Sequence, residues 1–284
     1  MAEAKKGFGL TNEDLASHPM TFAPGTLSGQ RAVISGGAGG IGRATAWLFA
    51  RLGAEVIITG RKTEKIAPLV EALEGAGHAA RGEALDIRDR DAVDSFWDSC
   101  FAEGGVDHLI NSAGGQFPSP AIDFTPKGWD AVINTNLNGT WHMMQAVALK
   151  WRDAGRGGNI VNIVVVTTGG LYGVAHTLAA RSGVIGLTRA VSVEWAPLDI
   201  RINCVAPGAI ETEGWDVYSE EARAAYPKSN PMMRVGTAWD IAQACAYLSA
   251  PSGRFVTGEV MAVDGGGQHW GETWTTGKPD YFKT

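Results

Sequence analysis

The sequence has few cysteines and no long hydrophobic run. Its three cysteines, Cys100, Cys204 and Cys245, are odd in number and match no metal-binding spacing, so we interpret them as reduced core thiols of a cytoplasmic protein. No apolar stretch is long enough to cross a membrane, and the first residues, MAEAKKGFGL, lack the apolar segment of a signal peptide. The sequence therefore predicts a soluble cytoplasmic protein without a structural disulfide or a bound metal.

Positive charge is also scarce. The chain has 24 Lys and Arg against 30 Asp and Glu, and its net charge is -6. Such a surface cannot neutralise a phosphate backbone, which argues against nucleic acid as a partner. Hydrophobic residues make up 45% of the 284 residues, enough for a core that folds autonomously, and this length favours a single domain.

Short apolar strands alternate with helical patterns along most of the chain. Strands are predicted at residues 31–35, 55–59, 107–111, 159–166, 201–206 and 260–263, and one further strand ends at Leu85. Helices are predicted at residues 41–52, 90–101, 127–151, 178–195 and 238–248, and one further helix begins after Lys62. This alternation predicts an α/β fold, a Rossmann-type doubly wound sheet of seven parallel strands flanked by helices.

The predicted organisation is one domain with two flanking segments. Residues 1–28 have no clear period and are predicted to form a surface arm. The domain spans residues 29–267, and its one long irregular segment, residues 208–236, is predicted to be a substrate lid. Residues 268–284 form a C-terminal tail.

A glycine-rich segment, SGGAGGIG at residues 35–42, lies between the first predicted strand and the following helix. Glycines allow a tight turn and a close backbone approach to phosphate, while the helix N-terminus supplies free N–H donors and a partial positive charge. In a βαβ unit this pattern predicts a site for a dinucleotide pyrophosphate, with Gly36, Gly40, Ile41 and Gly42 in the binding turn.

Read as G-x-x-x-G-x-G, this segment resembles the signature of the short-chain dehydrogenase/reductase family. Further motifs of the family follow in its order between residues 30 and 266: Asp86-Ile87, Asn111-Ser112-Ala113-Gly114, Asn136-Leu137-Asn138-Gly139, Pro207-Gly208-Ala209-Ile210 and Val263-Asp264-Gly265-Gly266. The resemblance implies that Asp86 and Ile87 border the adenine of a nicotinamide dinucleotide. It also implies that Asn111 and Ala113 line the cofactor cleft and that Ile210 and Thr212 face the nicotinamide, while Asn111 could instead cap a strand end. Gly114, Pro207 and Gly208 complete the implied cofactor site.

The end of the second predicted strand bears on the choice of cofactor. An NAD-dependent enzyme usually has a carboxylate here for the adenosine ribose, whereas this strand is followed by Arg61 and Lys62. Arg61 can meet a 2′-phosphate with a planar set of donors, and Lys62 can add a point charge. Both could instead belong to the exposed first turn of the next helix, but a positive charge there opposes the helix dipole. The residues therefore favour NADP(H).

The catalytic positions depart from the family pattern. Ordinary members carry a Ser after the fifth strand and a Tyr-x-x-x-Lys on the next helix, whose tyrosine transfers a proton. Here valines replace the serine, Thr177 takes the tyrosine position and Arg181 the lysine position. A threonine hydroxyl is too weak an acid to replace a phenol, and arginine keeps its proton near neutral pH. The cleft therefore either binds a dinucleotide without redox turnover or reduces a bond that does not need this relay.

The chain also resembles one branch of the family, the peroxisomal trans-2-enoyl-CoA reductases and their 2,4-dienoyl-CoA reductase relatives. The likeness is carried by APG at residues 23–25, GGQF at 114–117, KGW at 127–129, VAH at 174–176, AARSG at 179–183 and INCVAPG at 202–208. It implies an NADPH-dependent reductase of the conjugated double bond in an enoyl thioester, where hydrogen-bond donors stabilise charge on the thioester oxygen. The alternatives are a reductase or dehydrogenase of a ketone, alcohol or non-thioester enone, and a non-redox dinucleotide-binding protein.

Five residues are candidates for the chemistry. Arg181 is assigned to the nicotinamide ribose and to the CoA-side or enolate charge, His176 and Tyr172 are candidate proton donors, and Thr167 and Asn136 are supporting hydrogen-bond groups. Each has a simpler interpretation. His176 could cap the helix, Tyr172 could pack its ring in a loop, Thr167 could end a strand, and Asn136 could bridge helix and strand through water.

The predicted lid indicates the class of substrate, and the two long helices indicate the oligomeric state. The lid has an aromatic and thioether surface suited to an apolar acyl chain or ring, although these side chains could also pin the lid to the body; they are Trp215, Tyr218, Tyr226, Met232 and Met233. The expected partner is a small molecule, an acyl-CoA or another apolar enoyl compound. The helices at 127–151 and 178–195 resemble those that pair subunits in the family. Their apolar residues exceed what one sheet face can cover, which predicts a homotetramer; they are Trp141, Met144, Val191 and Trp195.

Overall fold

The computed structural model describes residues 7–169, 172–271, 275 and 279. Seven strands form one parallel sheet in the order β3-β2-β1-β4-β5-β6-β9. Their bounds are β1 Arg31–Ser35, β2 Glu55–Gly60, β3 Ala80–Ala84, β4 His108–Asn111, β5 Gly158–Ile163, β6 Ile200–Pro207 and β9 Val260–Val263. The predicted seven-stranded Rossmann-type sheet is confirmed, and its strand order reverses between β1 and β4, where such folds bind their ligands.

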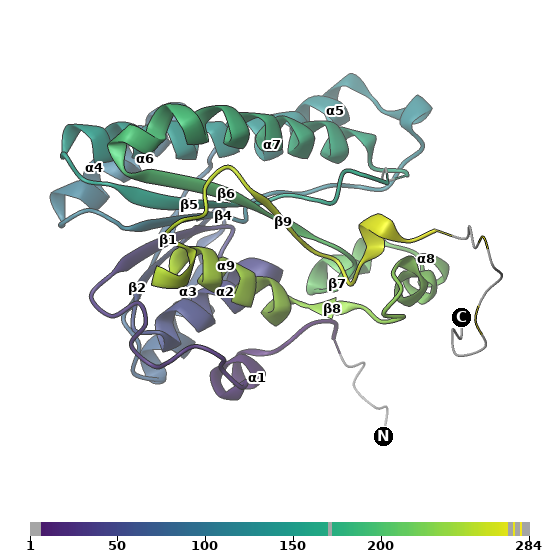
Figure 1. Cartoon of the computed structure of the whole chain (residues 1–284), viewed down its shortest axis with the longest axis horizontal. Helices are drawn as coiled ribbons and strands as arrows, with labels where there is room; N and C mark the ends of the chain where they lie inside the picture. Colours follow the sequence, from purple (N-terminus) through teal and green to yellow (C-terminus); the bar gives the residue numbers. More distant parts are fainter. Residues whose placement is uncertain (1–6, 170–171, 272–274, 276–278, 280–284) are drawn as a thin grey trace.

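Helices cover both faces of the sheet (Figure 1). On one face lie α2 Gly40–Arg51, α3 Thr63–Gly75 and α9 Ala238–Ser249; on the other lie α4 Arg90–Ala102, α6 Thr140–Asp153 and α7 Ala175–Trp195. Because the central strands are covered on both faces, their residues are continuously buried rather than alternating, as in β1 and β2. Cys100, Cys204 and Cys245 are buried free thiols, and burial raises the pKa of Cys245 to about 12.

The helix predicted at residues 127–151 is two helices joined by a π-helical turn. α5 spans Pro126–Ile133, the π turn spans Asn134–Gly139, and α6 follows. Gly139 packs so closely on Ile87 that an added Cβ would lie 2.6 Å from the Ile87 side chain. The widened turn also directs Asn136 into the interior, where it is 1% exposed. π turns of this kind are frequent at functional sites, and apolar periodicity alone does not reveal them.

The arm before β1 contains a helix that the sequence analysis missed, because six residues are too few to show a period. This helix, α1 Asn12–Ser17, begins with a capping box formed by Thr11 and Asp14, and its Leu15 is buried. Arg51 of α2 donates to the carbonyl oxygen of Leu15 at 2.8 Å, which ties the arm to the body.

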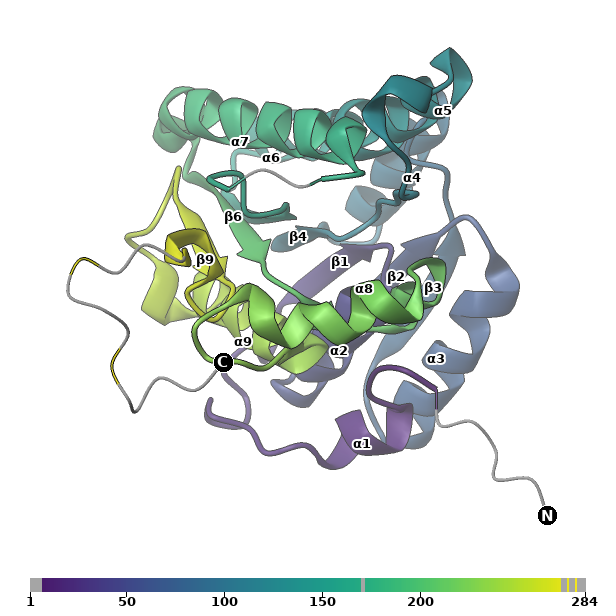
Figure 2. The ribbon, with the colours of Figure 1, turned by 90° about the vertical axis from the view of Figure 1, so that its right-hand side faces the viewer.

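The segment at residues 208–236 is more ordered than the sequence predicts. It contains β7 Ile210–Glu211, the 3₁₀ turns Glu213–Val217 and Tyr226–Ser229, and α8 Glu220–Ala225, and β8 Gly236–Thr237 follows at its end. β7 pairs in parallel with β8. Figure 2 shows α8 facing the viewer, beyond the carboxyl ends of the strands. The segment is therefore placed where a lid over the crevice would lie.

The apolar surface expected on the long helices is partly internal. Met144 and Val191 are buried in the core, and the half-buried rings of Trp141 and Trp195 stack on each other with centroids 6.3 Å apart. Met144 and Val191 are therefore not available for a subunit contact. No helix among the described residues has the length and apolar character to span a membrane.

Candidate active site

The glycine turn after β1 is built so tightly that side chains are excluded from it. Gly36 has φ +68°, and a Cβ there would lie 2.6 Å from the Ala113 backbone. A Cβ on Gly42 would lie 2.3 Å from the carbonyl oxygen of Gly36. The turn therefore presents bare backbone to the crevice, which fits the close approach of a pyrophosphate.

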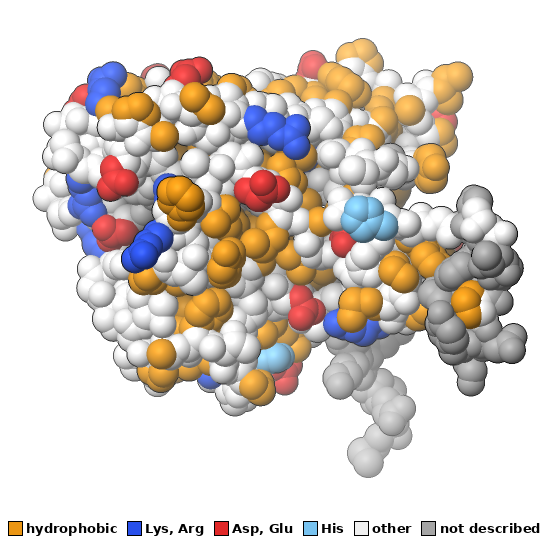
Figure 3. Space-filling view, in the orientation of Figure 1, with side chains coloured by type: hydrophobic (Ala, Val, Ile, Leu, Met, Phe, Trp, Pro, Cys, Tyr) orange, Lys and Arg blue, Asp and Glu red, His pale blue; other side chains and the backbone are white. Residues whose placement is uncertain are grey.

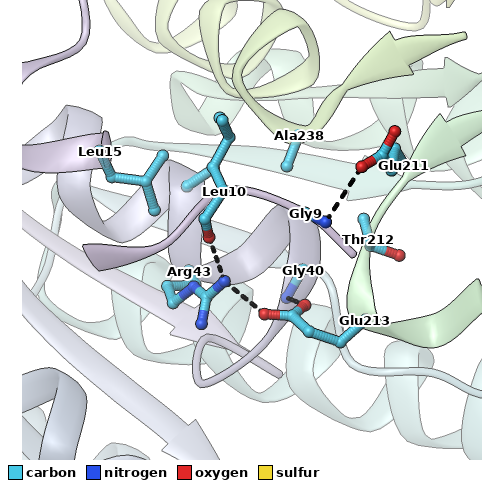
Figure 4. A pocket seen from close by; sticks show the side chains of 10 residues that line it. Gly9, Leu10, Leu15, Gly40, Arg43, Glu211, Thr212, Glu213 and Ala238 are labelled. Carbon is cyan, nitrogen blue, oxygen red and sulfur yellow. Dashed lines mark hydrogen bonds and ion pairs between the residues drawn. The ribbon is translucent and has the colours of Figure 1, made fainter. Parts of the chain in front are cut away.

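The start of α2 already binds an anionic oxygen (Figure 4). The backbone N–H of Gly40 donates to Oε2 of Glu213 at 3.0 Å, and the other oxygen of that carboxylate forms an ion pair with Arg43. Thr212 lies beside Gly40, since a Cβ on Gly40 would be 3.3 Å from the Thr212 side chain. The site predicted for phosphate is thus able to hold an oxyanion.

The expected 2′-phosphate site lies at the end of β2. Arg61 and Lys62 are both exposed, and Lys62 is the residue that precedes α3. Asp86 is paired with Arg88, whose Nε donates to Asp86 Oδ1 at 2.8 Å, and this hydrogen bond lowers the pKa of the Asp86 carboxyl. The charge of Arg61 contributes to the same shift, so it lies near Asp86. Arg88 is a third cation at this place, which the sequence analysis did not single out.

Asn111 is buried within the sheet. Its side chain is 1% exposed, its Nδ2 donates to Asn162 Oδ1 at 2.9 Å, and its Oδ1 accepts from Ser35 Oγ at 3.3 Å. Both hydrogen bonds link neighbouring strands, which agrees with the alternative interpretation of a strand-end residue. Its role is to hold β1, β4 and β5 together at their carboxyl ends.

The other predicted cofactor residues frame the same crevice. Gly208, just after Pro207, packs on Asp264, since a Cβ there would lie 2.7 Å from the Asp264 Cα. Ile210 is 8% exposed, and Ile87 is buried against Gly139. Gly208 directly follows β6, Ile210 begins β7, and Ile87 lies in the loop after β3.

Arg181 is the charged residue at the centre of the site. It is 8% exposed, its Nη1 has no hydrogen-bond partner among the described residues, and no ion pair is found for it there. A Cβ on Gly114 would lie 2.1 Å from Arg181 Nη2 and 3.1 Å from Asn136 Oδ1, so both side chains converge on Gly114. Burial lowers the pKa of Arg181 to about 10, and the group remains a cation at neutral pH. A buried, unpaired cation is a costly arrangement that an anionic ligand would relieve.

Asn136 is fixed by three hydrogen bonds. Its Oδ1 accepts from the N–H of Gly115 at 3.0 Å, while its Nδ2 donates to the Gly115 carbonyl oxygen at 2.9 Å and to Thr177 Oγ1 at 2.8 Å. It therefore joins the π turn, the loop after β4 and α7 directly rather than through water. Asn136 holds the loop against which Arg181 packs.

His176 is fully buried, with 0% exposure. Its ring stacks on Phe124 with centroids 4.4 Å apart and meets the edge of Phe117 at 4.6 Å. Nδ1 accepts from the backbone N–H of Thr177 at 2.8 Å, which leaves the proton of the neutral ring on Nε2. Nε2 is a buried donor that has no partner among the described residues.

Two candidates stand apart from this cluster. Tyr172 is 96% exposed, in contrast to the buried His176 and Arg181. Thr167 is half-buried in the loop after β5, and no hydrogen bond of its side chain is found among the described residues. The structure thus brings Arg181 and Asn136 together at Gly114, places His176 against Phe117 and Phe124, and leaves Tyr172 and Thr167 outside.

Thr177 makes a buried hydrogen bond that the sequence analysis did not predict. Because its hydroxyl accepts from the buried Asn136 amide, the Thr177→Val variant should lose about 1–3 kcal/mol of unfolding free energy, the cost of an unsatisfied buried donor. We expect turnover to fall severalfold as the Gly114–Gly115 loop loosens. Chemical denaturation and steady-state kinetics measure the two effects. Thr135→Val is the matched comparison, because this half-buried threonine of the same π turn donates only to the carbonyl oxygen of Ala131, at 2.9 Å.

The lid aromatics contact one another rather than an open surface. Trp215 is 9% exposed, and its ring meets Tyr226 at 5.0 Å. Tyr218 meets Tyr226 at 5.7 Å, and its hydroxyl is hydrogen-bonded to Gln116 of the loop after β4. The hydrogen bond to Gln116 links this segment to the loop after β4, while Met232 is 56% exposed.

Known proteins resemble this chain along most of its length. Residues 36–268 match the family model described as Enoyl-(Acyl carrier protein) reductase. A probable 2,4-dienoyl-CoA reductase of Bacillus subtilis is 38% identical over 82% of this chain and 94% of its own. A 3-oxoacyl-[acyl-carrier-protein] reductase of Thermotoga maritima is 35% identical over 84% and 98% of the two chains. The solved structure of a citronellol catabolism dehydrogenase from Pseudomonas aeruginosa superposes with a TM-score of 0.78, at 36% identity, over 87% and 98% of the two chains.

Proposed function

The chain belongs to the short-chain dehydrogenase/reductase family of oxidoreductases, and from this premise we propose that it is an NADPH-dependent reductase of an enoyl thioester. The observation that carries the proposal is the buried Arg181, whose unpartnered Nη1 is a charged donor in a site without the usual serine and tyrosine. Relatives named as dienoyl-CoA reductases support a thioester substrate, and those named as 3-oxoacyl reductases support an acyl chain.

The cofactor site is assigned to the residues around the glycine turn. The backbone of Gly36, Gly40, Ile41 and Gly42 would hold the pyrophosphate, and Arg61 and Lys62 the 2′-phosphate. The bound dinucleotide would supply a hydride from its nicotinamide ring. Ile210 and Thr212 would lie on the nicotinamide side of this site, and the close packing of Gly208 on Asp264 supports that wall.

The protein's own side chains handle the charge and the proton. When hydride adds to the β-carbon of the double bond, negative charge develops on the thioester oxygen, where the Arg181 guanidinium can donate hydrogen bonds. His176 could donate a hydrogen bond from Nε2 to the same oxygen, and the α-carbon would take up a proton from solvent to complete the reduction. Asn136 holds the loop at Gly114 against the Arg181 side chain and does not itself transfer a proton.

A direct assay tests this proposal. Purified protein is mixed with NADPH and either crotonyl-CoA or a panel of ketones, and the loss of nicotinamide absorbance is followed. We expect turnover with crotonyl-CoA alone. Turnover only with ketones would favour carbonyl reduction with a lid phenol, Tyr218, as acid, because its hydroxyl contacts Gln116 beside the site. Tight dinucleotide binding without turnover on either would indicate a non-redox protein.

Cofactor choice gives a second prediction. Arg61→Ala should weaken NADPH binding by about 1–3 kcal/mol, the range for a charge-assisted contact, and leave NADH binding nearly unaltered. Titration of cofactor fluorescence measures both affinities. Arg90→Ala, on α4 and paired with Asp94, is the control for loss of a surface charge. Equal losses of NADPH and NADH affinity would overturn the assignment.

For assembly we propose a homotetramer that uses the open sheet edge. β9 is the last strand of the sheet, all four of its residues are half-buried, and Phe255 just before it is 100% exposed. Hydrophobic side chains gather at the centre of the face in Figure 3, where β9 and α9 lie in Figure 1. Unprotected apolar edges tend to be covered by a partner.

Light scattering at micromolar concentration should give the mass of a tetramer, and Phe255→Asp should lower that mass. A monomeric wild type would contradict the proposal.

A further inference from the structure

One carboxylate from the lid bridges two groups at the start of α2. Glu213 accepts from the Gly40 N–H through Oε2 at 3.0 Å and pairs with the Arg43 guanidinium through Oε1. Figure 4 shows the two interactions converging on this side chain. The Gly40 N–H and the Arg43 guanidinium therefore lie close enough together to bind the same oxyanion.

The two groups are suited to a phosphate. Gly40 is the first residue of α2, where backbone N–H groups lack helical acceptors and the helix dipole favours negative charge. Arg43 has a further unused donor, because its buried Nε has no partner among the described residues. A diphosphate offers more acceptor oxygens than a carboxylate and could engage this donor as well.

We propose that Glu213 is an internal substitute for the cofactor pyrophosphate and that Arg43 is a cofactor-binding residue. In the cofactor-free protein the Glu213 carboxylate occupies the Gly40 amide and Arg43. An incoming dinucleotide displaces it, because two anions cannot share these donors, and Arg43 then pairs with a phosphate oxygen. The inference rests on the dinucleotide site of the proposed function and is independent of which substrate is reduced.

The displaced contact also connects the cofactor to the N-terminal arm. Gly9 donates from its backbone N–H to Glu211 at 3.4 Å, and Arg43 donates to the carbonyl oxygen of Leu10. Phe8 lies 5.9 Å from the Trp215 ring, and its face is covered by the Arg223 guanidinium at 5.1 Å. Residues 8–10 of the arm therefore rest on the lid segment that Glu213 anchors, and release of Glu213 loosens both.

Cofactor affinity in four proteins tests the proposal: wild type, Glu213→Ala, Arg43→Gln and the double variant, each titrated with NADPH and NADH. Glu213→Ala should tighten both cofactors by about three- to tenfold, the scale of one helix-terminus contact together with one surface ion pair. In the Glu213→Ala background, Arg43→Gln should weaken both by about five- to twentyfold, the scale of a charge-assisted hydrogen bond. Glu220→Gln, an exposed lid acid, is the control and should change neither affinity.

The outcomes separate this proposal from the others. Because the diphosphate is common to both cofactors, Arg43→Gln should weaken the binding of NADPH and NADH equally. Arg61→Ala, in contrast, should weaken the binding of NADPH alone. Hydrogen exchange at residues 7–10 should rise when NADPH binds to the wild type and should already be raised in unliganded Glu213→Ala. Unchanged or weakened binding in Glu213→Ala, or no effect of Arg43→Gln in that background, overturns the inference. A protein that shows the expected shifts but does not reduce crotonyl-CoA retains this inference and loses only the proposed substrate.

Discussion

Arg181→Ala is expected to lower turnover of the enoyl thioester by at least about a hundred- to a thousandfold, the loss measured for removal of one preorganised oxyanion donor. The side chain is buried, remains a cation at neutral pH and has an unpartnered Nη1. Such a donor is worth most when charge develops on a substrate in a site that excludes water. Single-turnover measurements with saturating NADPH separate this loss from weaker cofactor binding.

Two further variants show whether the effect belongs to the site. Arg181→Lys keeps the charge but loses the planar set of donors, so it should recover only part of the activity. Arg189→Ala removes an exposed arginine from the same helix and should leave the rate unchanged. Near-normal turnover in Arg181→Ala would contradict the assignment of the anion site. A loss of folding, detected as a lower melting temperature, is checked for each variant.

The sheet could be predicted from the sequence because its strands are short, apolar and separated by helices. The bounds of β1 and β9 agree with the predicted residues 31–35 and 260–263. The glycine turn was equally clear, since the steric need for Gly36 and Gly42 is local. Such features depend on neighbours in the chain, and these neighbours are visible in a sequence.

Contacts between distant segments could not be predicted in this way. Asn111 stood in a cofactor motif, and only the paired strands show that its amide is used by Asn162 and Ser35. The hydrogen bond of Thr177 could not be predicted, because it depends on a π turn that places Asn136, 41 residues away in the sequence, next to the Thr177 hydroxyl. Glu213 gave no signal at all, since its two partners lie in α2.

His176→Leu and Tyr172→Phe test which of the two side chains acts on the substrate oxygen. We expect His176→Leu to lower turnover about a hundredfold, the scale for loss of one hydrogen-bond donor to a developing oxyanion, because it removes a buried Nε2–H that has no partner among the described residues. Tyr172→Phe should be silent, since that ring is 96% exposed. Leucine keeps apolar contact with Phe117 and Phe124, so cofactor affinity and melting temperature should change little.

The reverse pattern would assign the donor to Tyr172 and require the loop before α7 to close over the substrate. Tyr218→Phe completes the set, because the Tyr218 hydroxyl contacts Gln116 in the loop after β4. A hundredfold loss confined to Tyr218→Phe would place the acid in the lid and favour carbonyl reduction over enoyl reduction. If all three variants keep full activity, proton transfer comes from solvent, and Arg181 alone stabilises the charge that develops on the substrate oxygen.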